Sequence, residues 1–370
     1  MRQRREERVA RGSDQARLAA QASLDRSNPS ERRSRLGQFA TPPELAEAIL
    51  EVCRQQFGPG EAVRFLDPGG GTGAFFSALL RTFGRERVAR AVTYEIDRGV
   101  ARVAERLWSS HGLEVRCRDF TTAHEELADA AFNLVVCNPP YSRHHYLSRE
   151  TKLRLQAWIG AHTGLAVNGL AGMAVYFMLM AHQHLDLDGV AAWLIPSEVL
   201  DVNYGAVVRE YLSSRVTTLR IHRFPSEETQ FDDALVSSCV VLLRNRTPPR
   251  GHEVMFTSGK DLLAPVRRTA VLTGQLRREH KWGRLFERQT APQAQRHGLV
   301  AIGDLFDVRR GIATGANGFF VMQTEEARRR GIPTHFLRPV LPSPRHVTGC
   351  TIHAADDSTP MLSPSLVLLD

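Results

Sequence analysis

Segments of strand and helix character alternate along residues 63–196, and this alternation constrains the fold more than any other feature of the sequence. Strands are predicted at 63–67, 90–95, 113–117, 132–137 and 190–196, with helices at 74–83, 98–110 and 174–185. Two more strands follow without a clear helix between them, at 217–224 and 234–244. Strands that alternate with helices form a mostly parallel sheet covered on both faces. We therefore predict an α/β fold with a seven-stranded sheet, in which the last two strands form an antiparallel hairpin at one edge.

The positive charge of the chain is concentrated towards its two ends. The formal net charge is +8, and because only three lysines are present, nearly all of the cations are arginines. Residues 244–330 hold 17 Lys and Arg against 8 Asp and Glu, and residues 1–35 hold 10 Arg against 5 acidic residues. Two basic segments around a near-neutral middle indicate binding to a polyanion, and a solvated arginine-rich surface is the alternative explanation.

Composition also gives the expected domain boundaries. Residues 1–34 are polar, Arg-rich and Ser-rich, which predicts a basic N-terminal arm that is flexible or partly helical. The alternation of strands and helices fades after "NRTPP", and the sequence beyond it is basic and richer in Pro, Gly and Thr. We therefore expect one domain over residues 35–245 and a second, basic domain over residues 246–370. Because the chain ends on the apolar run "SLVLLD", we expect the second domain to be incomplete.

The sequence lacks the features of a membrane-spanning, secreted or metal-binding protein. No apolar run is long enough to cross a bilayer, and the N-terminus has no apolar segment of the kind found in signal peptides. The five cysteines are scattered without C-x-x-C spacing, which argues against a zinc site or a disulfide framework. We expect a cytoplasmic protein without a metal site.

The segment "TPPELAEAILEVC", residues 41–53, predicts the beginning of a helix. Thr41 can cap the N-terminus, Pro42 suits the first helical position, and Glu44 lies where a capping box places its acid. Apolar residues follow at helical spacing.

A glycine-rich turn, "FLDPGGGTGAFF", lies between the first predicted strand and the following helix. Glycines let the backbone approach a ligand closely, and the beginning of the helix offers free N–H groups. The dinucleotide fingerprint G-x-G-x-x-G does not fit, because Phe76 stands where the third glycine belongs. The order instead matches the D-P-x-x-G-x-G loop that surrounds the methionine part of S-adenosylmethionine. The predicted cofactor-binding residues in this turn are Asp67, Gly69, Gly71 and Gly73.

Candidate ligand-binding residues also follow the next two predicted strands. Glu95 comes 22 residues after Gly73, where an acid can accept both hydroxyl groups of a ribose. Asp119 and Phe120 follow the third strand, where they could hydrogen-bond to an adenine ring and stack on it. Open α/β sheets bind ligands at the carboxyl ends of their strands. Three such positions in succession therefore predict the adenosine part of a cofactor site.

The fourth strand ends in the predicted catalytic segment Asn138-Pro139-Pro140-Tyr141. The exocyclic amine of a nucleobase is a poor nucleophile, because its lone pair is delocalised into the ring. The Asn138 side-chain oxygen and the Pro139 carbonyl can accept both hydrogens of such an amine and favour a tetrahedral nitrogen. Pro139 and Pro140 would hold these acceptors rigid, and Tyr141 can stack on the base. A proline turn capped by an asparagine is the purely structural interpretation.

Together these motifs make the sequence resemble the gamma-class N6-adenine DNA methyltransferases, which include those of TaqI-like and Eco57I-like restriction-modification systems. The order of the motifs carries the resemblance, because "LGQFATPPELA" precedes the glycine turn and "NPPY" follows it. The resemblance covers residues 35–245 well and the rest loosely. It implies a Rossmann-like S-adenosylmethionine-dependent methyltransferase fold followed by a C-terminal target-recognition domain that binds DNA.

The resemblance also assigns roles to further residues. Those placed near the cofactor are Gln38, Phe39 and Thr41. Phe231 is implied to pack on the target base opposite Tyr141, and an ordinary core position is its alternative role. "VRRGIATGANGFFVM" is similar to the opening of the target-recognition domain, and the DNA-binding residues it implies are Arg309, Arg310 and Asn317.

The implied activity is transfer of a methyl group from S-adenosylmethionine to N6 of an adenine flipped out of double-stranded DNA, in a restriction-modification or related defence system. Double-stranded DNA is the expected partner, a cognate restriction endonuclease is a further candidate partner, and we expect a monomer. Methylation of a protein glutamine or of RNA adenine remains an alternative, which the segment at 36–46 and the basic C-terminal part disfavour. Methylation of cytosine N4 and a DNA-binding remnant without activity also remain open.

Overall fold

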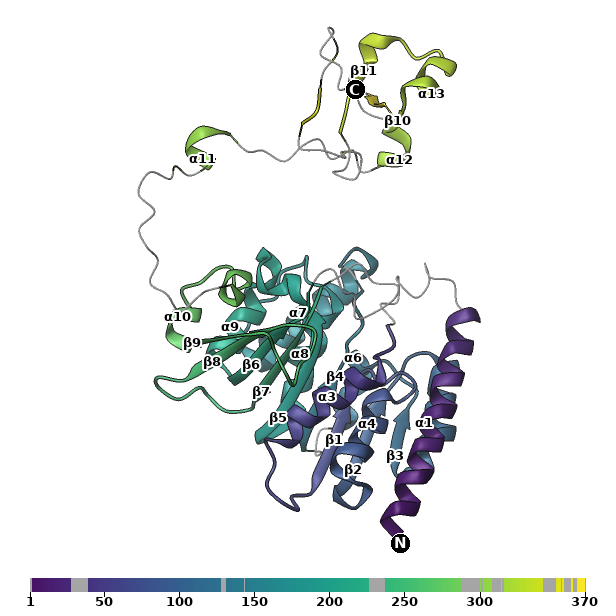
Figure 1. The fold of residues 1–370 in the computed structure, drawn as a ribbon, viewed down its shortest axis with the longest axis vertical. Coiled ribbons are helices and arrows are strands. Elements are labelled where there is room, and N and C mark those ends of the chain that lie inside the picture. Colours follow the sequence, from purple (N-terminus) through teal and green to yellow (C-terminus); the bar gives the residue numbers. More distant parts are fainter. Residues whose placement is uncertain are drawn as a thin grey trace. The chain divides into compact units, whose positions relative to one another are not determined.

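Figure 1 shows the fold of the chain, obtained as a computed structural model. The structure describes residues 2–27, 39–127, 131–142, 144–225, 237–287, 300, 302–307, 314, 316–341, 351–353, 355, 361 and 365–369. The chain forms two compact units, Met1–Pro292 and Gln293–Asp370.

The first unit is built on one sheet with the strand order β3-β2-β1-β4-β5-β7-β6-β8-β9. Strands β1 to β5 pair in parallel, β7 is antiparallel to β5 and β6, and β8 is parallel to β6 and antiparallel to β9. The α/β class and the mostly parallel sheet are therefore confirmed. The strands are β1 (Val63–Asp67), β2 (Val88–Tyr94), β3 (Leu113–Arg116), β4 (Phe132–Cys137), β5 (Leu185–Pro196), β6 (Thr217–Arg223), β7 (Ser238–Arg244), β8 (Glu253–Ser258) and β9 (Arg267–Leu272).

The sheet extends further along the chain than the sequence indicated. Nine strands form it rather than seven, because β8 and β9 continue it past β6. The antiparallel pair of β6 and β7 consequently lies inside the sheet and not at its edge. The first unit also ends at Pro292 instead of residue 245. In β9 only alternate residues such as Thr269 and Val271 are buried, so no continuous apolar run marked this strand in the sequence.

Helices cover both faces of the sheet in the first unit (Figure 1). One face carries α3 (Pro43–Arg54), α4 (Ala74–Phe83) and α5 (Arg98–Trp108), which share one hydrophobic core with the sheet. The opposite face carries α6 (Phe120–Ala123), α7 (Arg149–Thr163), α8 (Met173–Ala181) and α9 (Ala206–Ser214), which share the other core. The short helix α10 (Thr273–Leu276) follows β9.

The central strands are apolar over the stretches in which both of their faces are buried. In β4, Val135 and Cys137 belong to one core, whereas Leu134 and Val136 belong to the other. Successive side chains of a strand point to opposite faces, so a strand needs consecutive apolar residues wherever helices cover both faces. The polar Asn138 therefore comes at the point where β4 leaves the core.

The N-terminal arm is more ordered than the sequence indicated. Helix α1 (Arg2–Ser27) is 26 residues long and packs against α4 and α5. Asp14 and Arg17 of this helix are buried. Most of the segment predicted as a flexible or partly helical arm is thus part of the first unit.

Helix α3 begins differently from the prediction. Its N-cap is Pro42 rather than Thr41, and no side chain caps it. Thr41 is buried, and its hydroxyl accepts a hydrogen bond from the Asn138 side-chain amide at 3.2 Å. Thr41 therefore connects the beginning of α3 to the end of β4 instead of capping the helix.

The second unit contains a small antiparallel sheet with the order β10-β12-β11. Met322, Ala327 and Val367 form its core. Within the parts of the chain that the structure describes, no helix is long and apolar enough to cross a bilayer. The elements of this unit are α11 (Ile302–Leu305), α12 (Asn317–Phe320), β10 (Val321–Gln323), α13 (Thr324–Arg329), β11 (Leu337–Pro339) and β12 (Leu366–Leu369).

Candidate functional site

A cavity of about 390 Å³ lies at the carboxyl ends of the central strands of the first unit. Segments far apart in the sequence meet around it, as expected for a ligand site in an open α/β sheet. The residues of its wall come from α1 (Gln21, Leu24 and Asp25), from the segment before α3 (Phe39), and from the segments after β1 (Gly69 and Gly71), β2 (Glu95 and Ile96), β3 (Arg118, Asp119 and Phe120) and β4 (Asn138 and Pro140).

The glycine turn is tight on its protein side and open towards the cavity. Gly73 has φ +92°, and a Cβ there would collide with the Trp108 indole, which donates a hydrogen bond to the Thr72 carbonyl at 2.9 Å. A Cβ on Gly70 would collide with Thr93. Gly71 also has a positive φ, +54°, but no atom lies within 4 Å of the position that its Cβ would take. Only Gly71 of these three therefore leaves its space to a ligand.

Asp67 stabilises the glycine turn by hydrogen bonds and does not line the cavity. Its side chain is 2% exposed and accepts a hydrogen bond from the Gly69 N–H at 3.1 Å. Its carbonyl accepts another from the Thr93 hydroxyl at 3.0 Å. Burial, together with the nearby charge of Glu95, raises the pKa of Asp67 to about 7. The structure thus gives Asp67 a direct role in positioning the turn.

Glu95 presents a nearly buried carboxylate to the cavity at the end of β2. Its Oε1 accepts a hydrogen bond from the Asp97 N–H at 2.8 Å. Burial raises the pKa of Glu95 to about 7, although the N–H groups of Asp97, Gly71 and Ile96 stabilise its charge. A carboxylate at this position suits a ligand that carries hydroxyl groups.

Asp119 and Phe120 both line the cavity, and each also stabilises the segment after β3. Asp119 caps α6, where its Oδ1 accepts hydrogen bonds from the N–H and the hydroxyl of Thr121 at 2.8 and 2.9 Å. The Phe120 ring is almost wholly buried and packs edge-on against Tyr94, with 5.3 Å between ring centroids. Only a small part of the Phe120 ring is therefore available to stack on a ligand.

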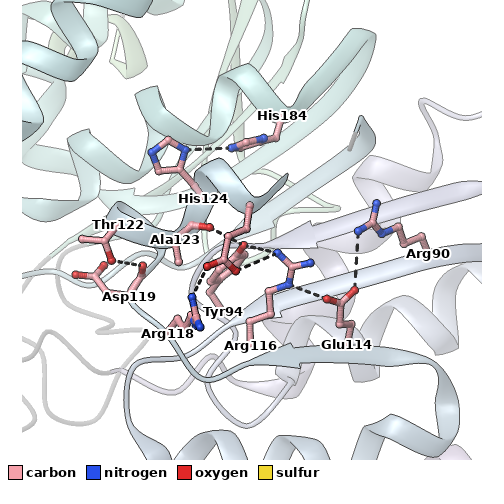
Figure 2. A network of polar contacts seen from close by, with 11 residues as sticks. Arg90, Tyr94, Glu114, Arg116, Arg118, Asp119, Thr122, Ala123, His124 and His184 are labelled. Atoms are coloured by element: carbon pink, nitrogen blue, oxygen red, sulfur yellow. Dashed lines mark hydrogen bonds and ion pairs between the residues drawn. The ribbon is translucent and has the colours of Figure 1, made fainter. Parts of the chain in front are cut away.

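A polar network fixes the position of this segment relative to the sheet (Figure 2). Arg116 donates hydrogen bonds to the Tyr94 hydroxyl at 2.9 Å and to Glu114 at 2.7 Å. The Tyr94 hydroxyl in turn donates to the Ala123 carbonyl in α6 at 3.3 Å. Because these bonds join β2, β3 and α6, they hold Asp119 beside the cavity. No local pattern in the sequence indicates this network, since its members belong to separate elements of the chain.

The side chain of Asn138 is oriented by two acceptors, and its own oxygen is left without a partner. Its Nδ2 donates to the Phe39 carbonyl at 3.0 Å and to the Thr41 hydroxyl at 3.2 Å. The Phe39 carbonyl can only accept, so the amide nitrogen must face it. The Asn138 Oδ1 is buried and has no hydrogen-bond partner among the residues that the structure describes. Such an oxygen is costly in a folded protein unless a ligand satisfies it.

Tyr141 borders a second cavity, of about 240 Å³, instead of the larger one. Its ring is tilted against Phe39, with 5.8 Å between centroids, and its hydroxyl donates to the Leu194 carbonyl at 3.2 Å. Pro196, Val199 and Tyr204 also line this second cavity. Ser142 and Met173 line both cavities, so the two lie side by side with the Asn138–Tyr141 segment between them.

The structure brings most of the predicted site residues together. Those that line the larger cavity are Phe39, Gly69, Gly71, Glu95, Asp119, Phe120, Asn138 and Pro140. Those placed behind it or beside it are Thr41, Asp67, Gly73, Pro139 and Tyr141. Asn317 begins α12 in the second unit, where its Oδ1 accepts a hydrogen bond from Thr314 at 2.5 Å. The predicted residues that fall outside the described part of the chain are Gln38, Phe231, Arg309 and Arg310.

Sequence reasoning missed the contribution of α1. Gln21, Leu24 and Asp25 line the larger cavity, although this segment was predicted to be a basic arm. A signal was present, because Asp14, Arg17, Gln21 and Leu24 follow each other at helical intervals of three and four residues. The pattern was not recognised, since three of these four residues are polar.

Comparison with known proteins gave consistent matches. Residues 24–282 match the family described as N-6 DNA Methylase. The type II methyltransferase M.AccI of Acinetobacter calcoaceticus is 25% identical over 84% of this chain and 57% of its own length. The type II methyltransferase M.XamI of Xanthomonas campestris pv. amaranthicola is 26% identical over the same shares. The chain thus spans little more than half the length of these relatives.

A solved structure agrees with the fold. It comes from Listeria monocytogenes, is assigned to the class I S-adenosylmethionine-dependent methyltransferases, and has a TM-score of 0.53 and 16% identity. The match covers 70% of this chain and 75% of that protein. At this identity the likeness concerns the fold alone.

Proposed function

Because this chain belongs to the N-6 DNA Methylase family, we propose that it transfers a methyl group from S-adenosylmethionine to N6 of an adenine in double-stranded DNA. The observation that carries the proposal is the buried Asn138 Oδ1 at the edge of the larger cavity, which has no hydrogen-bond partner among the described residues. An oxygen held in this way is suited to accept a hydrogen from an exocyclic amine. We further propose that the protein acts in a restriction-modification system, with a cognate endonuclease as a possible partner.

The residues of the larger cavity fit S-adenosylmethionine. Gly71 leaves open space beside the turn, which suits the methionine part, and Glu95 can accept the ribose hydroxyls. Asp119 would accept from the adenine amine. When bound, the cofactor supplies an electrophilic methyl group on its sulfonium.

Asn138 would prepare the target amine to attack the methyl group. Its Oδ1 would accept one amine hydrogen, and the Pro139 carbonyl would accept the other. Both bonds favour a tetrahedral nitrogen and release its lone pair from the ring. The hydrogen bonds from Asn138 to Phe39 and Thr41 keep the acceptor in place, so no reorganisation is needed during the reaction.

The second cavity is our proposed pocket for the target adenine. A base inside a duplex cannot be reached by an enclosed site, so it must be flipped out. Tyr141 would stack on the flipped base from one side of this cavity, and Phe231 remains the candidate for the other side. Because the two cavities share Ser142 and Met173, the base and the cofactor would lie next to each other.

The basic C-terminal part would contact the DNA backbone. Residues 244–330 carry a clear excess of arginine and lysine, and cations of this kind neutralise phosphates. Arg309, Arg310 and Asn317 remain our candidates for contacts to phosphates or bases. Residues 244–292 of this basic range belong to the first unit, so both units would contact DNA, and the second unit is our candidate for a target-recognition domain.

The experiment that tests the proposal offers the 370-residue chain three acceptors in parallel. Tritiated S-adenosylmethionine is incubated with unmethylated genomic DNA, with tRNA and with a release factor, and labelled nucleosides are identified after digestion. We expect label in N6-methyladenine from DNA alone. Label in N4-methylcytosine would correct the target base, and label only in tRNA or in the release factor would refute the proposal.

Cofactor affinity should fall on acidification through about pH 7. Burial raises the pKa of Glu95 to about 7, so the free protein holds a proton on this carboxyl below that pH. The charged form accepts hydroxyls best, so binding releases the proton, and affinity should fall by up to about tenfold per pH unit below pH 7. Isothermal titration in buffers of different ionisation enthalpy would measure the protons released.

The variant Glu95→Gln distinguishes the titration of Glu95 from that of the other carboxyl groups in the site. It should bind the cofactor more weakly than the wild type above pH 7, and below pH 7 its binding should release about one proton fewer. An affinity of the wild type that does not change between about pH 6 and about pH 8 would rule out this role for Glu95.

A further inference from the structure

A buried ionic cluster binds helix α1 to α4. Asp14 accepts hydrogen bonds from Arg17 at 2.7 Å, from Ser77 of α4 at 2.8 Å, and from Arg81 of α4 at 2.8 Å. Arg81 also pairs with Glu47 of α3 at 2.8 Å. A buried carboxylate that is bonded to two guanidinium groups and a hydroxyl fixes the rotation of the helix on its neighbours.

One turn beyond this anchor, the helix reaches the glycine turn. The Thr72 hydroxyl donates to the Gln21 Oε1 at 2.9 Å, and the Gln21 amide donates to the Asp25 carboxylate at 3.0 Å. This chain of bonds joins the glycine turn to the last two turns of α1. Gln21, Leu24 and Asp25 all line the larger cavity.

The electrostatics of the cavity favour a cationic ligand. Asp25, Glu95 and Asp119 are carboxylates in its wall, and Arg118 is the guanidinium that lines it in the described part of the chain. Arg118 forms an ion pair with Glu126, which offsets its charge. Asp25 also lies in the last turns of a long helix, where the macrodipole adds negative potential.

We propose that the C-terminal half of α1 forms one wall of the S-adenosylmethionine site, in which Gln21 positions the glycine turn and Asp25 favours the cationic cofactor over its demethylated product. The inference rests on the proposed function, because it concerns the same site. S-adenosylmethionine and S-adenosylhomocysteine differ by one methyl group and by the sulfonium charge. A carboxylate in the wall therefore stabilises the first more than the second.

The test compares binding of the two ligands by isothermal titration. Gln21→Ala and Leu24→Ala should each raise the Kd of both ligands about tenfold, since they remove contacts that the ligands share. Asp25→Asn should raise the Kd of S-adenosylmethionine about fivefold more than that of S-adenosylhomocysteine. A purely structural role of Asp25 would weaken both ligands equally.

Exposed positions of the same helix provide matched controls. Gln15→Ala and Leu18→Ala make the same chemical changes on the outer side of α1 and should leave both Kd values within twofold of the wild type. Hydrogen exchange of residues 14–27 should slow when S-adenosylmethionine is added to the wild type.

The possible outcomes separate this inference from the proposed function. If the wild type binds S-adenosylmethionine but Gln21→Ala, Leu24→Ala and Asp25→Asn bind as the controls do, the wall formed by α1 is refuted and the function stands. Equal loss of both ligands in Asp25→Asn would refute the charge discrimination. A wild type that binds neither ligand would overturn the function and this inference together.

Discussion

Replacing Asn138 with alanine is expected to lower the rate constant of methyl transfer by about 10² to 10³, while the Kd of S-adenosylmethionine changes by less than about tenfold. The variant removes a buried acceptor that the protein keeps oriented without satisfying it. The target amine would then keep its lone pair in the ring during attack. Single-turnover kinetics with labelled cofactor and a saturating DNA substrate would measure the rate constant.

Two further variants make this result specific. Asn133→Ala changes an asparagine at the other end of β4, where it bonds to the Ala62 carbonyl at 2.8 Å and accepts from the Arg64 N–H at 2.8 Å. Its rate constant should stay within a few-fold of the wild type. Asn138→Asp keeps an acceptor oxygen for the amine but loses the donor to the Phe39 carbonyl, and it should retain a larger fraction of the rate than Asn138→Ala. A rate in Asn138→Ala equal to that of Asn133→Ala would contradict the assigned role.

The second large effect concerns stability. Trp108 is fully buried, packs edge-on against Phe76 and donates from its indole to the Thr72 carbonyl at 2.9 Å. Trp108→Ala should lower the free energy of unfolding by about 3–5 kcal/mol, because it leaves a cavity beneath the glycine turn. Urea denaturation followed by circular dichroism would measure the change.

Phenylalanine variants isolate the contribution of the indole hydrogen bond. Trp108→Phe keeps most of the apolar packing but leaves the Thr72 carbonyl without this donor, so it should cost about 1–2 kcal/mol and weaken cofactor binding. Trp158→Phe is the matched control, because the Trp158 indole nitrogen is buried without a partner among the described residues. It should cost less than Trp108→Phe. Equal losses in the two variants would show that the bond to Thr72 contributes little.

Local patterns predicted the parts of the fold that depend on neighbouring residues. The strand at Val63–Asp67, the helix at Ala74–Phe83 and the strand at Phe132–Cys137 have the predicted bounds. Each combines a continuous apolar or amphipathic run with a clear stop, glycine on one side or proline on the other. Thr41 shows the limit of such reasoning. The predicted capping box is not formed, and the Thr41 hydroxyl instead accepts a hydrogen bond from the distant Asn138.

The motifs also predicted which residues gather at the candidate site, and less well what each does there. The carboxyl ends of parallel strands share one edge, so Gly71, Glu95 and Asn138 meet at one cavity. Asp67 was expected at the ligand but lies behind the turn, because the side chain of the last residue of a strand can point to either side. The assigned roles remain predictions for the experiments described above.

The sequence by itself determined the α/β class, the glycine turn and the succession of candidate residues at strand ends, because these follow from side-chain periodicity and backbone preferences over a few residues. Only the tertiary structure decided that β8 and β9 extend the sheet and that α1 closes one wall of the cavity. It alone also left the Asn138 Oδ1 without a hydrogen-bond partner in the part of the chain that the structure describes. These features depend on contacts between residues tens of positions apart, whose free energy comes from mutual burial and pairing that no local pattern encodes.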